Sequence, residues 1–183
     1  MKKIVLTFGL ICGVIMSVLM CSATLLAHKI GEGHSLLLGY TILVASFLLV
    51  YFGIRSYRDN TLGGQISFGR AFACGILITL ITCVCYVAVW EVVYFKFVPH
   101  FMDSYWAGQV QKVQAAGLDP ATTAAKVAAI EKQEQMYQNP LVNMAYTFME
   151  PLPVGLLITL ISAALLRRKA PVQPAGGRTV LTT

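Results

Sequence analysis

Four long runs of apolar residues constrain this chain more than any other feature of its sequence. They cover residues 4–27, 36–54, 71–95 and 141–166. About 20 apolar residues in an α-helix rise roughly 30 Å, which matches the hydrocarbon core of a bilayer. Hydrophobic residues make up 57% of the chain and charged residues only 12%, against roughly 25% charged residues in soluble domains. The sequence therefore predicts an all-α integral membrane protein, with one four-helix bundle within residues 1–169.

The first run follows Lys2 and Lys3, which also matches the start of a cleaved signal peptide. The run exceeds the usual length of roughly 7 to 15 apolar residues, and no clear small-x-small cleavage site precedes His28. We therefore expect it to remain as the first span. Residues 170–183 are rich in Pro, Gly and Thr and poor in apolar residues, so we expect a disordered cytoplasmic tail there.

The charged residues separate by side of the predicted membrane. Nine basic residues and one acidic residue, Asp59, lie before the first run, between the second and third, and after the fourth. The two other connecting segments carry five basic and five acidic residues. Because segments rich in Lys and Arg stay in the cytoplasm, we expect both termini and the loop between spans two and three to be cytoplasmic. The basic excess favours anionic lipid as a partner over nucleic acid, since no basic face is interleaved with aromatic residues.

Small residues recur at every fourth position in three of the spans. In lipid there is little hydrophobic drive between helices, so close backbone approach along such stripes supplies much of the packing. We expect spans one, three and four to touch along them, within one chain or between two, and span two to be more exposed to lipid. The stripes are Gly9, Gly13, Ser17 and Cys21; Ala71, Gly75, Thr79 and Cys83; and Gly155, Thr159 and Ala163.

Residues 99–139 form the one substantial segment between spans. Apolar residues recur with helical spacing before Gly117, which suits the end of a helix. Asp119 and Pro120 suit the start of a second helix, because Asp caps a helix and Pro is tolerated at its first position. The sequence thus predicts an extracytoplasmic helical hairpin between spans three and four. It carries no dense polar cluster, which favours an interfacial cover or a partner-docking element over a ligand-binding domain.

Glu91 and Glu150 are the acidic residues within the apolar runs. An unpaired charge costs at least about 2.5 kcal/mol near the bilayer centre. Both residues lie toward the outer ends of their spans at comparable depth, so they can face each other. Pro151 and Pro153 lack N–H groups, which frees two carbonyl groups and predicts a kink. One hypothesis is a proton or cation site of Glu91, Glu150 and these carbonyl groups; the alternative, which we favour, is two carboxylates at the headgroup level.

No known catalytic or cofactor-binding pattern is present in the sequence. It contains no Gly-rich phosphate loop, no paired metal-ligand histidines and no Gly-x-Ser-x-Gly motif. The five cysteines all lie within spans one and three, where packing as small apolar side chains is their expected role. We therefore expect no enzymatic activity, no cofactor and no bound metal.

The segment GGQISFGRAF, residues 63–72, leads into span three. Its Gly pair permits a tight reversal, Ser67 can cap the helix, and Arg70 can anchor the cytoplasmic end. This segment, its aromatic continuation to Pro99, the four-span order and the Glu-Pro-x-Pro sequence at residues 150–153 resemble the membrane-protein family called domain of unknown function 4199. The resemblance covers most of the chain before the tail. It implies a bacterial cytoplasmic-membrane protein and supplies no activity.

These expectations favour a structural or accessory membrane subunit that binds lipid and either another membrane protein or a second copy of itself. The alternative is a small transporter or channel subunit that uses Glu91 and Glu150 to couple protons or cations. An accessory subunit should co-purify with another membrane protein, whereas a transporter should work alone or as a homo-oligomer.

Overall fold

The computed structural model describes residues 1–30, 32–98, 100 and 102–168, with residues 25–30 and 32–36 described by their backbone alone. These residues form seven α-helices and no strand, which confirms the predicted all-α class. The tail predicted for residues 170–183 lies outside the described residues. The helices are α1 (Lys2–Ile30), α2 (Glu32–Thr61), α3 (Phe68–Lys96), α4 (Asp103–Ala115), α5 (Pro120–Tyr137), α6 (Pro140–Met149) and α7 (Pro151–Leu166).

Four helical stretches are long and apolar enough to cross a membrane, as the sequence predicts. They are Lys2–Thr24 of α1, Leu37–Thr61 of α2, the whole of α3, and α6 with α7. The fourth stretch consists of two helices because proline has no N–H group with which to continue the hydrogen bonds of α6. Glu150 lies at the break between α6 and α7.

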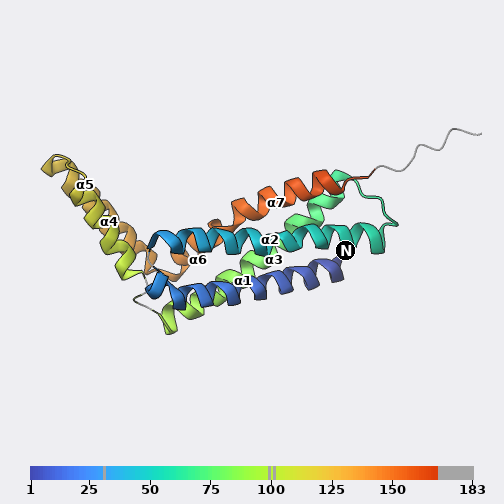
Figure 1. Ribbon diagram of the computed structural model, residues 1–183, viewed down its shortest axis with the longest axis horizontal. Coiled ribbons are helices and arrows are strands. Elements are labelled where there is room, and N and C mark those ends of the chain that lie inside the picture. The colour runs from blue at the N-terminus through green and yellow to red at the C-terminus, as the bar shows by residue number, and fades with distance from the viewer. Residues whose placement is uncertain (31, 99, 101, 169–183) are drawn as a thin grey trace, which may run out of the picture.

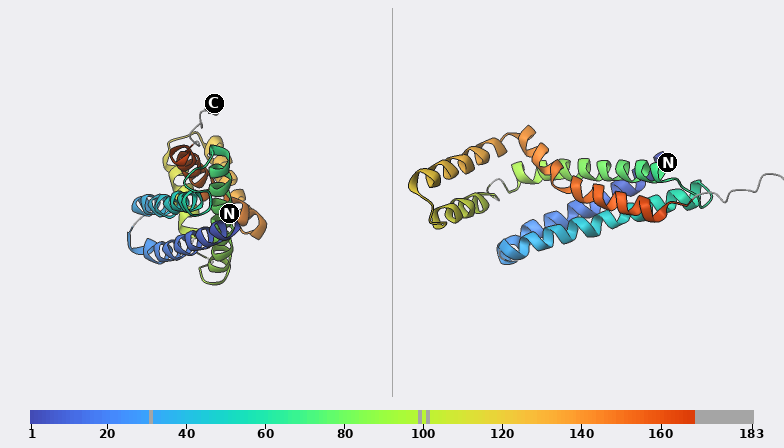
Figure 2. Two further views of the ribbon diagram at one scale, coloured as in Figure 1. Left: turned by 90° about the vertical axis from the view of Figure 1, so that its right-hand side faces the viewer. Right: turned by 90° about the horizontal axis from the view of Figure 1, so that it is seen from above.

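The spanning helices pack as a bundle in which α2 and α3 lie between α1 and α7 (Figures 1 and 2). α1 packs against α2 and α3, and α7 packs against the same two helices. Within the described part of the chain, α1 and α7 share no contact. The expectation that spans one, three and four all touch is therefore wrong for α1 and α7, because α2 and α3 meet between them.

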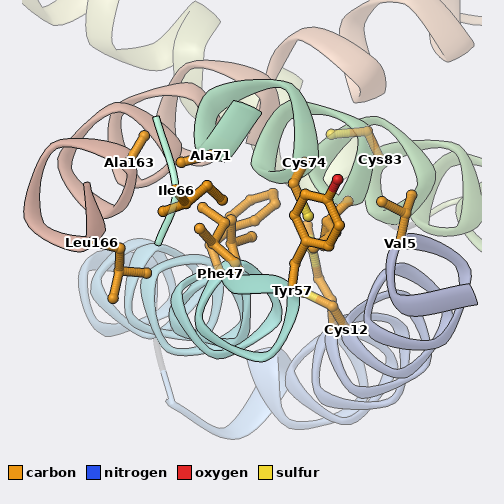
Figure 3. Packing of buried hydrophobic residues seen from close by; sticks show 14 of the residues in the cluster. Val5, Cys12, Phe47, Tyr57, Ile66, Ala71, Cys74, Cys83, Ala163 and Leu166 are labelled. Carbon is orange, nitrogen blue, oxygen red and sulfur yellow. The ribbon is translucent and has the colours of Figure 1, made fainter. Parts of the chain in front are cut away.

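The second span also differs from its predicted position. Phe47, Val50 and Ile54 of α2 are fully buried, so this helix is not more exposed to lipid than the others. Its large side chains fill the centre of the bundle. The spacing of small residues in the sequence does not indicate this central position. Figure 3 shows Phe47 among buried side chains that include Cys12 and Cys74 of the neighbouring helices.

The small residues of α3 and α7 face each other. A Cβ atom at Gly75 would lie 2.7 Å from Thr159 Cγ2, and one at Gly155 would lie 2.5 Å from Thr79 Cγ2. The hydroxyl oxygens of Thr79 and Thr159 are 3.0 Å apart and share a hydrogen bond. Glycine at these two positions therefore lets the helix backbones approach closely, as helix packing in lipid requires.

A second close contact joins α1 to α3. A Cβ atom at Gly9 would lie 2.8 Å from Ile81 Cγ2, and one at Gly13 would lie 2.6 Å from Cys85 Cβ. The Thr82 hydroxyl donates to the carbonyl oxygen of Gly9 over 3.3 Å. The sequence left open whether Gly9 and Gly13 pack within one chain or between two; in this structure they pack within the chain.

The loop between α2 and α3 has the features expected from its sequence. Gly63 and Gly64 have φ values of 63° and 86°, which favour glycine. The side chain of Ser67 caps α3 by accepting a hydrogen bond from the backbone N–H of Arg70. Ile66 and Arg168 then exchange two backbone hydrogen bonds of 3.2 and 3.0 Å, which fasten this loop to the end of α7.

α4 and α5 pack together as a hairpin that extends beyond the spanning helices, at the end of the bundle away from the N-terminus (Figures 1 and 2). Gly117 in the turn has a φ of 65°. Asp119 caps α5, its Oδ1 accepting a hydrogen bond of 3.0 Å from the Thr122 backbone N–H. Among their described residues, only Trp106 of α4 is buried, and α5 has no buried residue.

Candidate functional site

Glu150 is hydrogen-bonded to α3 where the fourth spanning stretch is broken. The Tyr86 hydroxyl donates to Glu150 Oε2 over 3.5 Å. Tyr86 itself is buried, whereas Glu150 is exposed. Because Pro151 and Pro153 lack N–H groups, the carbonyl groups of Thr147 and Met149 have no helical donor four residues on. At the break, the Glu150 carboxylate therefore accepts a hydrogen bond from a phenol of α3. The two carbonyl groups without helical donors lie close to Glu150 in the sequence.

The two carboxylates lie at different distances from the hairpin end of the bundle. Glu150 follows the start of α6 by about ten residues, or roughly 15 Å, and Glu91 precedes the end of α3 by about five residues, or roughly 8 Å. If each stretch of roughly 40 Å is centred on a 30 Å core, Glu150 lies about 10 Å inside the core and Glu91 near its edge. A charge on Glu150 therefore costs more free energy than a charge on Glu91.

Among the described residues, no hydrogen bond joins Glu91 to Glu150. Glu91 Oε1 is buried and accepts no hydrogen bond from the part of the chain that the structure describes. The ion pairs of those residues involve neither carboxylate. A joint proton or cation site of Glu91 and Glu150 stays a prediction.

Five aromatic side chains join the hairpin to the bundle, and we call them the aromatic cluster. Tyr137, the last residue of α5, lies at its centre. The Tyr137 ring centroid is 5.5 Å from that of Tyr94, 6.0 Å from that of Trp106 and 6.2 Å from that of Tyr146. Trp90 stacks on Tyr94 at 5.8 Å. Each such ring pair contributes roughly 0.5 to 1.5 kcal/mol beyond its buried area, so the cluster holds the base of the hairpin.

Polar contacts reinforce the same junction. The buried Asn143 donates from Nδ2 to the carbonyl oxygen of Tyr137 over 3.4 Å, and its Oδ1 accepts from the Thr147 hydroxyl over 3.2 Å. Gln138 Nε2 donates to the Tyr94 hydroxyl over 3.3 Å. These bonds connect the end of α5 to both α6 and α3.

Both carboxylates also affect the pKa of the Tyr137 phenol. Burial is the main cause that raises the pKa of this phenol, and the negative charges of Glu150 and Glu91 raise that pKa further. Hydrogen bonds with neighbouring side chains offset the rise only in part. The phenol is therefore a neutral hydrogen-bonding group at neutral pH, not a base.

The polar side chains of α6 differ in their exposure. Asn143 and Thr147, four residues apart, are buried, whereas Tyr146 and Glu150 are exposed. A helix turns about 100° per residue, so each i, i+4 pair shares a face while the two pairs do not coincide. Trp106 is buried against Tyr137, a contact that no local spacing in the sequence indicates.

The side chains of this region can form hydrogen bonds and can carry a negative charge. Among the described residues, no group of three or more His, Cys, Asp or Glu side chains could hold a metal ion. Glu150 can bind or release a proton, Tyr86 can donate a hydrogen bond to it, and the exposed carboxylate can meet a positive charge outside the bundle. The aromatic cluster positions the hairpin, and among the described residues none of its five side chains donates a hydrogen bond to Glu91 or Glu150.

Comparison with known proteins identifies a family and no characterised relative. No curated protein and no solved structure matches the chain. One family profile, described as protein of unknown function (DUF4199), matches residues 7–168. That match includes most of the first spanning stretch, the whole of the other three, the hairpin and the loop before α3. The chain therefore belongs to the DUF4199 family.

Proposed function

We propose that the protein is an accessory subunit of a membrane assembly, in which four spanning stretches anchor a hairpin that binds a partner protein. The observation that carries this proposal is the combination of a free surface and a fixed base. α5 has no buried residue, yet Tyr137 at its end is packed against α3, α4 and α6. A helix that is held in place before binding loses less entropy when a partner docks on it.

The proposed location is the cytoplasmic membrane of a bacterium, with both termini in the cytoplasm and the hairpin outside. The charge distribution along the sequence supports this orientation, because the segments before the first run, between the second and third, and after the fourth carry nine basic residues and one acidic residue. Anionic lipid headgroups are the natural partners of these segments. The proposed role needs no catalytic activity, cofactor or nucleic acid.

Crosslinking in native membranes tests the accessory role. The full chain is purified in mild detergent after crosslinking, and accompanying proteins are identified by mass spectrometry. We expect a heterologous membrane protein in stoichiometric amount, crosslinked to residues of α4 or α5. Recovery of the homo-oligomer alone would contradict the proposal.

A second candidate function, a small transporter or channel subunit, rests on a different observation. Glu150 lies at a break in a spanning stretch, a place where transporters bind ions, and a buried phenol holds its carboxylate. The test is ion flux into liposomes that contain the purified protein. A pH-dependent flux that the Glu91→Gln, Glu150→Gln double variant abolishes would support transport, and absence of flux from the parent would exclude it.

A further inference from the structure

One side of α6 and α7 is exposed along its whole length. The exposed positions recur with helical spacing, and we call them the exposed stripe: Tyr146, Glu150, Pro153, Leu157 and Ile161. Tyr146 is 47% exposed, Leu157 58% and Ile161 51%. In a membrane this side faces lipid or the transmembrane part of another protein.

A carboxylate in the middle of such a stripe is unusual, because lipid-facing positions are normally apolar. With its spanning stretch centred on the hydrocarbon core, Glu150 falls about 10 Å inside that core, where an unpaired charge is costly. Among the described residues its hydrogen-bond donor is the uncharged Tyr86 hydroxyl, which fixes Oε2 and brings no positive charge. The ion pairs of the described residues draw their basic groups from Arg55, Arg58 and His100, none of which reaches Glu150.

The stripe stays exposed on α6 although Tyr146 touches the Tyr137 ring and Glu150 accepts from the Tyr86 hydroxyl. The contacts of α6 are with α3, α5 and α7, and the described residues of α1 and α2 do not contact it. The hairpin continues from α6 beyond the end of the bundle (Figure 2). The stripe thus stays open for a helix from outside the chain.

We propose that the exposed stripe binds a transmembrane helix of a different protein, which places a Lys or Arg side chain opposite Glu150. Charge complementarity selects this occupant, since a basic group would neutralise the carboxylate in a region of low dielectric. A second copy of the chain does not qualify, because residues 4–27, 36–54, 71–95 and 141–166 contain no Lys or Arg. This inference rests on the proposed accessory role and adds to it the site and the charge of the partner.

The test uses the full-length protein in lipid bilayers at neutral pH and two synthetic transmembrane peptides. Each peptide has about 20 leucine residues; one carries a single lysine at the depth of Glu150 and the other has none. Association is measured by fluorescence energy transfer between labelled protein and labelled peptide. We expect the lysine peptide to bind at least about tenfold more tightly than the leucine peptide, since polar contacts between helices contribute on that order.

Two variants locate the effect. Glu150→Gln removes the charge on the stripe and should abolish the preference for the lysine peptide. Glu91→Gln makes the same chemical change on α3, which carries none of the stripe residues, and should leave the preference in place. The comparison of the two peptides on the parent protein does not depend on how either variant folds.

Equal binding of both peptides to the parent would overturn the inference and would leave Glu150 as a neutral acid in lipid. Transfer between two labelled copies of the protein that Glu150→Gln abolishes would also overturn it, in favour of self-association. If these results appear while crosslinking in native membranes still yields a heterologous partner on α4 or α5, the accessory role stands and only the stripe is wrong.

Discussion

At Gly155 a single missing side chain sets how closely α7 approaches the centre of the bundle. A Cβ atom there would lie 2.5 Å from Thr79 Cγ2 and 2.8 Å from Phe47 Cε1. Both neighbours are buried and cannot move into solvent. Gly39 of α2 differs, since a Cβ atom there would meet nothing within 4 Å.

We predict that Gly155→Ala lowers the free energy of unfolding by roughly 1 to 3 kcal/mol, because an added methyl group overpacks a filled core. Denaturation by SDS in mixed micelles, followed by circular dichroism, measures the change. The matched control Gly39→Ala adds the same methyl group to open space and should cause no loss. Equal losses from both variants would show that the contact of Gly155 with Thr79 and Phe47 does not limit packing.

A residue-scale prediction with a pH dependence concerns Asp119. Hydrogen bonding by Thr122 to the Asp119 carboxyl holds the pKa of that carboxyl below its usual value of 3.8. A carboxylate with a lowered native pKa stabilises the folded state above the ordinary pKa and loses that effect as pH falls through the native pKa. We therefore expect the start of α5 to loosen only in acid, below about pH 3.8.

Hydrogen exchange of the Thr122 amide, corrected for the intrinsic rate at each pH, measures this loosening. Protection should fall in the acid range in the parent. Asp119→Asn keeps a side-chain oxygen that caps the helix but cannot titrate, so its protection should not change with pH. A parent whose protection is also constant would remove the proposed role of the carboxylate.

At the scale of elements, the junction between hairpin and bundle depends on Tyr137. Its ring contacts Tyr94, Trp106 and Tyr146, and its carbonyl oxygen accepts from Asn143. Tyr137→Ala removes all three ring contacts, each of roughly 0.5 to 1.5 kcal/mol. We predict that the hairpin then moves relative to α3, so the distance distribution between spin labels at positions 96 and 126 broadens.

The control for this element is Tyr105→Ala. Tyr105 is also aromatic and on α4, but it is 45% exposed, and its ring pairs with Trp106 and is not one of the three that contact Tyr137. Its removal should leave the distance distribution close to that of the parent. Broadening of similar size in both variants would mean that the hairpin is held by the whole surface of α4 and not by the aromatic cluster.

Local sequence predicted most of the helices, but it did not predict which helices contact one another. Gly117 and Asp119 marked the hairpin turn because their backbone and capping preferences act over a few residues. The expected lipid exposure of span two was wrong, and the burial of Trp106 was not foreseen, because burial depends on which helix comes to lie beside a residue. The Tyr86–Glu150 bond joins residues 64 positions apart, and no pattern within either helix contains that pairing.

At the scale of the whole molecule, charge asymmetry predicts one orientation in the membrane. The segments at the end with the α2–α3 loop carry nine basic residues and one acid, whereas the hairpin end carries five of each. We predict that a cysteine introduced at Lys126 reacts with a membrane-impermeant maleimide in intact cells. A cysteine introduced at Gln65, in the α2–α3 loop, should react only after the membrane is opened, because Lys- and Arg-rich loops remain inside.

The five native cysteines set the background for this labelling. All of them lie in spanning helices and are buried or only partly exposed, so an impermeant reagent should not reach them. The parent without an introduced cysteine measures what remains. Labelling of position 65 but not of position 126 in intact cells would reverse the orientation, place the hairpin in the cytoplasm, and direct the search for its partner to cytoplasmic proteins.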